Sequence, residues 1–103
     1  MPTRDLTYIE RIAQDVYEIA SATEQPYLAD EASLWLGYAV LVLTKGTETT
    51  SADVHEAWSA WAAVRHNGNH RSLIPFDELE PKIQAYDDLY RDAIHAVAKR
   101  RAA

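Results

Sequence analysis

The residues best suited to chemistry lie in one stretch of the chain that contains no carboxylate. Between Ala57 and Phe76 there is no aspartate and no glutamate, although acidic residues outnumber basic ones by 16 to 10 overall. A tryptophan ring can stack on a planar base, and a guanidinium can pair with phosphate through two parallel hydrogen bonds. The pattern therefore predicts a site for a flat anionic small molecule. We also include His55, which lies just before the stretch. The candidate ligand-binding residues are His55, Trp58, Trp61, Arg65, His70 and Arg71.

Each of these residue types also has a structural interpretation. Trp58 and Trp61 are three residues apart, so they share one helical face and could both belong to the core. A tryptophan at the edge of a core can still wall a pocket, so the two interpretations are compatible. His55 is expected to hydrogen-bond a backbone carbonyl in residues 72–75, as buried polar groups usually do. In the functional alternative, it donates to a ligand.

Metal binding and catalysis are weaker interpretations of the sequence. His66 and His70 are four residues apart, but Gly68 interrupts the helix that would aim both rings at one ion. Acidic clusters at residues 77–80 and 87–88 fall at turns and helix starts, where capping and the helix dipole explain them. The three glycines lie far apart, which excludes a glycine-rich phosphate loop. We therefore expect a protein that is not an enzyme and holds no metal or cofactor.

Composition limits the class of partner. The formal net charge of −6 argues against nucleic-acid binding, which needs a basic surface to meet phosphates. Without cysteine, neither a disulfide nor a thiolate metal site can form. The most apolar run, Leu34 to Leu43, is ten residues long, whereas a membrane-spanning helix needs about 20. We expect no membrane partner and, in the absence of a recognisable targeting segment, a cytoplasmic location.

Hydrophobic periodicity predicts four helices and no strand. They are expected at residues 5–22, 31–45, 51–66 and 81–97, the last with a break near residues 87–88. Asp30 is a candidate N-cap for the second helix, and Thr50 with Asp53 resembles a capping box for the third. Gly46 is a suitable stop after the second helix. Residues 72–76 should be extended, because Pro75 disfavours helical geometry in the residue before it.

The expected fold is therefore all-α: a compact four-helix domain, crossed by an extended proline-containing segment and spanning residues 1–103 as a single domain. The nearly all-apolar run at residues 34–43 should make the second helix the most buried one. We expect Phe76 to hold the extended segment near Trp58. The predicted core residues are Ile9, Val16, Leu36, Val40, Leu43, Trp58, Leu73 and Ile94.

Three segments together resemble a ryanodine-receptor repeat, or RyR domain. They are residues 52–58, residues 73–79 and residues 88–94, and the similarity covers about residues 51–97. The family has a His-x-x-Trp helix, an arginine, a Leu-Val-Pro-Tyr-like segment, a lysine and a final Arg-Glu-Ala-Val-like helix. The family's Gly-Trp turn is missing here, and a shorter Asn-Gly-Asn turn replaces it. The matching positions are His55, Trp58, Arg65, Leu73, Pro75, Phe76, Leu79, Lys82 and Arg91.

The whole chain also resembles a group of short proteins of actinobacteria and their phages. Those proteins carry a Tyr-Ala-Val-Leu run before a Lys-Gly turn, then Val-His-x-Ala-Trp and Pro-Phe-x-Glu-Leu segments. The corresponding residues here are 38–41, 45–46, 54–58 and 75–79. This second resemblance implies a source but no function.

The RyR resemblance implies a ligand-sensing module, with adenine nucleotides or their derivatives as candidate ligands. The partner we expect is accordingly a nucleotide-derived small molecule. The six tyrosines support a different function, because tyrosine is favoured at interfaces, where it buries area and keeps a polar group. The alternative is therefore a protein–protein interaction module, as a homodimer or a host or phage regulatory protein.

Overall fold

The structure is a computed structural model that describes residues 5–102, and within them every regular element is a helix. The α-helices are α1 (Tyr8–Ser21), α2 (Ala32–Thr44), α3 (Ser51–Arg65), α4 (Pro81–Gln84) and α5 (Tyr86–Ala102). Short 3-10 turns occur at Ala29–Glu31, Gly46–Glu48 and Phe76–Glu78. The all-α prediction is confirmed. The last predicted helix is divided at Ala85, slightly before the expected break, into the single turn α4 and the long helix α5.

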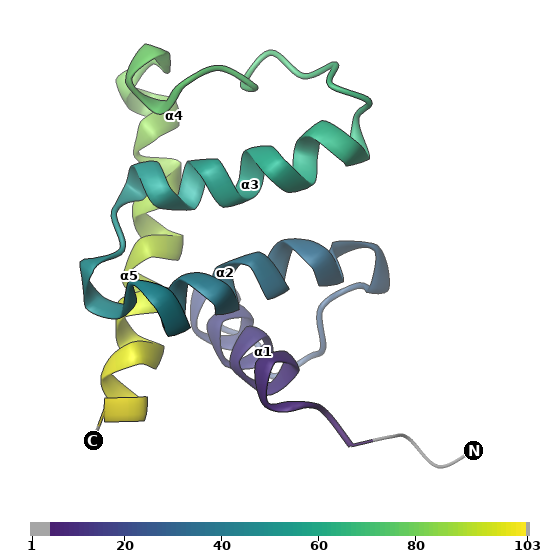
Figure 1. The fold of residues 1–103 in the computed structure, drawn as a ribbon, viewed down its shortest axis with the longest axis vertical. Helices are drawn as coiled ribbons and strands as arrows, with labels where there is room; N and C mark the ends of the chain where they lie inside the picture. The colour runs from purple at the N-terminus through teal and green to yellow at the C-terminus, as the bar shows by residue number, and fades with distance from the viewer. Residues whose placement is uncertain (1–4, 103) are drawn as a thin grey trace.

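Helix α5 is the element that joins the others. It contacts α1, α2 and α3, while α1 also packs on α2 and α2 on α3. Helices α2 and α3 run in opposite directions, and α5 passes across both of them (Figure 1). After α3 the chain arches back to α4, so residues 66–80 return from the far end of α3 to the beginning of α5 (Figure 1).

Two capping boxes set the beginnings of helices. Thr50 and Asp53 bond reciprocally at the start of α3, as predicted, with N···O distances of 2.9 and 3.1 Å. Thr7 and Glu10 form the same arrangement at the start of α1, which was not predicted. The prediction for Asp30 is wrong: it lies in a 3-10 turn, and the N-cap of α2 is Glu31, which makes no side-chain capping bond.

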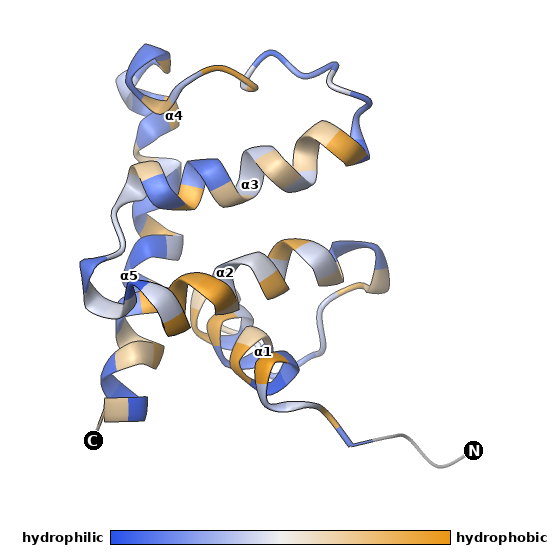
Figure 2. Cartoon of the chain, viewed as in Figure 1, coloured by the Kyte–Doolittle hydropathy of each residue, from blue (hydrophilic) through white to orange (hydrophobic). Residues whose placement is uncertain are grey.

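Helix α2 buries a different face from the one predicted. Trp35, Tyr38, Ala39 and Val42 are buried, whereas Val40 and Leu43 are 46% and 41% exposed. Helix α2 is apolar on almost every side, so the sequence contained no polar stripe to mark its outer face. Figure 2 shows apolar residues along the C-terminal end of α2, whereas α5 is mostly hydrophilic. Of the other predicted core residues, Val16 and Ile94 are fully buried, and Ile9, Leu36, Trp58 and Leu73 are half-buried.

Most of the tyrosines belong to an internal aromatic cluster around Trp35. The Trp35 ring meets Tyr17, Tyr38 and Tyr90 at centroid distances of 5.0, 5.3 and 5.9 Å, and Tyr27 packs edge-on against Tyr17. Such edge-to-face pairs add stabilisation beyond the area that they bury. These tyrosines serve packing inside the chain, and only Tyr8 and Tyr86 are largely exposed.

No helix within residues 5–102 is both long enough and apolar enough to cross a lipid bilayer.

Candidate ligand-binding site

A cavity of about 720 Å³ lies between α3, the returning segment and the α4–α5 corner. We call it the central cavity. Four of the six predicted ligand-binding residues line it: His55, Trp58, His70 and Arg71. Its other walls include Tyr38 from α2, Ile83 from α4, and Tyr86, Asp87 and Tyr90 from α5. A concave site of this size, with mainly apolar walls and a few polar groups, is the usual form of a small-molecule site.

Three aromatic rings form one side of the central cavity. The imidazole of His55 stacks on the Trp58 indole at a centroid distance of 5.6 Å and an interplanar angle of 21°. His70 meets the same indole edge-on, at 5.1 Å and 78°. Trp58 is half-buried, so it belongs partly to the packing and partly to the cavity wall.

His55 ties the returning segment to α3. His55 is 4% exposed, and its Nε2 lies 2.7 Å from the carbonyl oxygen of Ile74. The predicted hydrogen bond to a backbone carbonyl of residues 72–75 is therefore confirmed. A carbonyl oxygen can only accept, so Nε2 carries a proton, and in the neutral ring Nδ1 is left as an acceptor. The Phe76 ring also packs near this histidine, at a centroid distance of 6.1 Å.

Asp87 is a site residue that sequence reasoning missed. Its carboxylate lies 4.0 Å from Nδ1 of His55, and its side chain is 14% exposed. Removal from water raises the pKa of Asp87 to about 6; the protonated form of His55 opposes this rise, and the neighbouring charge of Asp88 adds to it. The two members of the pair are 32 positions apart, and no local pattern links them. A carboxyl group with a raised pKa inside a cavity is typical of functional sites.

The other two predicted site residues, Trp61 and Arg65, do not line the central cavity. The Trp61 ring lies against His66 at 6.2 Å, and the exposed guanidinium of Arg65 pairs with Asp30 at 3.6 Å. The residues of the acid-free stretch are therefore not free of neighbouring carboxylates in the folded structure. Asp30 approaches it at one end, and Glu78, Glu80 and Asp87 line the same cavity as Arg71.

A serine, a histidine and an aspartate also meet at this site. The Ser59 hydroxyl lies 3.4 Å from Nε2 of His55, whose Nδ1 faces Asp87. Nucleophilic catalysis would require Nε2 to take the hydroxyl proton. That nitrogen already carries a proton, which it donates to the Ile74 carbonyl, so the arrangement does not activate Ser59.

The turn after α3 brings His66 and His70 together, with ring centroids 5.1 Å apart. The predicted interruption of the helix is confirmed, since α3 ends at Arg65. Residues 67 and 68 both adopt positive φ and fold the chain back, and this turn brings the two rings together. Within residues 5–102, no group of three or more metal-ligating side chains is assembled.

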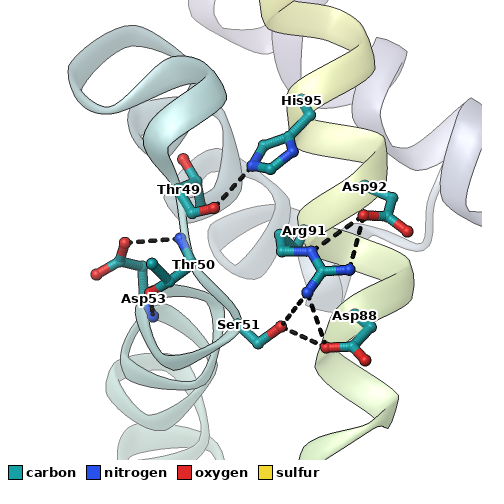
Figure 3. Close-up of polar contacts among 8 residues, drawn as sticks. All are labelled: Thr49, Thr50, Ser51, Asp53, Asp88, Arg91, Asp92 and His95. Atoms are coloured by element: carbon teal, nitrogen blue, oxygen red, sulfur yellow. Dashed lines mark hydrogen bonds and ion pairs between the residues drawn. The ribbon is translucent and has the colours of Figure 1, made fainter.

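A polar cluster fixes α5 against the beginning of α3 (Figure 3). Nη1 of Arg91 donates to the Ser51 hydroxyl and to Asp88, at 3.3 and 3.2 Å. Nη2 of the same guanidinium pairs with Asp92 at 3.0 Å. One turn further along α5, the His95 imidazole lies 2.7 Å from the Thr49 carbonyl oxygen. These contacts fix the position of α5 along α3, and with it the position of Asp87 in the first turn of α5.

Comparison with known proteins supplies a family but no activity. No curated protein and no solved structure gives a significant match to the chain. The family described as "Domain of unknown function (DUF7701)" matches residues 7–99, which include every residue of the central cavity. A match over this length shows that the chain belongs to the DUF7701 family.

Proposed function

We propose that the chain is a small binding module that holds a nucleotide-derived molecule in the central cavity. The main support is that four residues chosen as ligand contacts from the sequence line one cavity of about 720 Å³. Small-molecule pockets generally measure about 300–1,000 Å³. The RyR-like order of motifs is consistent with a sensing role, since His55 and Trp58 occupy both the motif and the cavity wall.

The arrangement of the cavity walls matches the two ends of a nucleotide. The half-buried Trp58 indole, on which His55 already stacks, gives the cavity an aromatic wall against which a flat ring can pack. Arg71 and His70 are exposed at the opening, where a phosphate would remain partly hydrated. The backbone N–H of Ser72 donates to Nδ1 of His70 at 3.0 Å, so in the neutral ring Nε2 carries the proton and can donate to a phosphate oxygen.

A thermal-shift panel of AMP, GMP, their cyclic forms and ADP-ribose tests this proposal. A ligand that binds only the folded state stabilises it by about 2.7 kcal/mol at 100 times its Kd. Arg71→Ala should weaken binding about 10-fold to 100-fold, because hydrogen bonds to charged groups contribute about 1.5–3 kcal/mol. Arg65→Ala is the matched control, since Arg65 is also exposed but lies outside the cavity, and it should leave affinity unchanged. Equal losses in the two variants, or no shift with any nucleotide, would refute the proposal.

A protein–protein interaction module remains the second candidate, and the outer face of α2 favours it. Leu36, Val40 and Leu43 lie four and three residues apart and so share one helical face, and the last two are more than 40% exposed. Two copies could bury this face against each other. A mass of one chain at high micromolar concentration in light scattering would rule out the homodimer.

A further inference from the structure

The central cavity has a buried floor and an exposed rim of different chemistry. Tyr38, His55 and Leu79 at the floor are 2–7% exposed, and Asp87 beside them is 14% exposed at its side chain. The rim consists of His70, Arg71, Glu78, Glu80 and Tyr86, all of them exposed. A ligand that enters therefore meets its buried contacts at the floor and its hydrated contacts at the rim.

Besides the Tyr38 hydroxyl, the floor presents two acceptors. Nδ1 of a neutral His55 is an acceptor, because Nε2 holds the proton and gives it to Ile74. The Asp87 carboxylate is also an acceptor, and 4.0 Å separates the two groups, too far for a hydrogen bond between them. Among residues 5–102, no N–H or O–H group hydrogen-bonds to this carboxylate, although it has been largely removed from water. A carboxylate that has lost part of its hydration is stabilised by new donors, so the floor is suited to a ligand that brings them.

We propose that the floor binds a planar edge that carries two adjacent N–H donors, and that the ligand is a guanine nucleotide. The inference rests on the function proposed above and specifies its ligand. Guanine presents N1–H and the 2-amino group side by side, and a carboxylate accepts both with its two oxygens. Adenine carries an acceptor at N1, which would face the Asp87 carboxylate and the Nδ1 acceptor of His55.

Arg71 and His70 at the rim favour guanine with its phosphate over the other common source of such an edge, a guanidinium group, which Glu78 and Glu80 would attract. Arg71 and the Nε2–H of His70 are donors that a phosphate can use and that a guanidinium cannot. Glu78 and Glu80 lie at the same rim and repel additional negative charge. A monophosphate should therefore bind better than a triphosphate.

Isothermal titration calorimetry on the full chain with GMP, IMP, AMP, GTP and agmatine tests this inference. GMP should bind most tightly. IMP lacks the 2-amino group, and AMP has an acceptor at N1; each should bind about 10-fold to 100-fold more weakly, the loss expected for a hydrogen bond to a charged group. Asp87→Asn should weaken GMP binding by at least about 10-fold, because the amide NH2 faces one of the ligand's donors. Asp77→Asn is the matched control, since Asp77 is exposed and lies outside this cavity, and it should bind GMP like the natural chain.

The outcomes separate this inference from the function on which it rests. If AMP or IMP binds as well as GMP, or if Asp87→Asn leaves GMP affinity unchanged, nucleotide binding stands and the guanine assignment is overturned. Binding of agmatine in preference to GMP also overturns that assignment, because the edge would then come from a guanidinium. If none of the nucleotides binds, both the inference and the proposed function are wrong.

Discussion

Replacing Asp87 with asparagine should make the folded protein more stable at neutral pH. The carboxylate lies in the central cavity with 14% of its side chain exposed, and His55 is 4.0 Å away. An ionised group in this position has lost much of its hydration and has gained only a long contact in return. Asparagine has nearly the same shape and carries no charge, so it removes this cost without opening a cavity.

The size of the effect follows from the pKa. A rise from the ordinary value of 3.8 to about 6 corresponds to about 3 kcal/mol, at 1.36 kcal/mol per pH unit. Because the cavity opens to water, which screens part of the charge, we expect about 1–3 kcal/mol. The pKa is higher in the folded state, so the protonated group favours folding. That stability is complete below about pH 4 and is lost as the pH rises through about 6.

Urea denaturation of both proteins at several pH values between about 4 and 8, followed by circular dichroism, measures this difference. The gain in unfolding free energy from Asp87→Asn should be close to zero at about pH 4 and should reach its full value by about pH 7. Asp77→Asn, at an exposed carboxylate, should differ from the natural chain by less than about 0.5 kcal/mol throughout. A gain for Asp87→Asn that does not change with pH would show that ionisation of this group is not the cause.

Two further substitutions test the packing and the capping. Ile94→Ala removes a fully buried side chain from the core, so it should lower the unfolding free energy in urea by about 2–5 kcal/mol; a loss under about 1 kcal/mol would place Ile94 outside the core. Thr50→Ala removes the capping hydroxyl at the start of α3 and should cost about 1 kcal/mol, whereas Thr50→Ser should retain most of the stability; equal losses in both would contradict the capping role.

The parts of the fold that depend on neighbouring residues could be predicted from the sequence. The Thr50 and Asp53 capping box spans three residues, and its hydrogen bonds form wherever that helix begins. Residues 67 and 68 adopt the positive φ expected of Asn and Gly, and Pro81 occupies the first turn of α4. The His55 bond to the returning segment was also predictable, because a buried histidine needs a polar partner and a non-helical segment has free carbonyl groups. The prediction that residues 72–76 are extended throughout is wrong, since they contain a turn and Phe76 begins a 3-10 turn.

Part of the candidate site was predictable for the same reason. Trp58 and His55 lie three residues apart, so a helix places them side by side. His70 and Arg71 lie just beyond the turn that ends this helix, and the folding back of that turn returns them to the Trp58 ring. Trp61 and Arg65 have the same residue chemistry, but their side chains lie outside the cavity, and a single helix cannot present all of its residues to one site.

The sequence alone determined the all-α class, the beginning of α3 and the local pairs, because these depend on hydrogen bonds and periodicity within a few residues. Only the tertiary structure decided which face of α2 is buried, since a helix that is apolar on almost every side has no preferred outer face until its neighbours pack against it. It also decided that Asp30 reaches Arg65 and that Asp87 reaches His55. These contacts join residues far apart in the chain, and they form because α5 packs across α3 and brings its first turn, with an almost buried carboxylate, to the floor of the cavity.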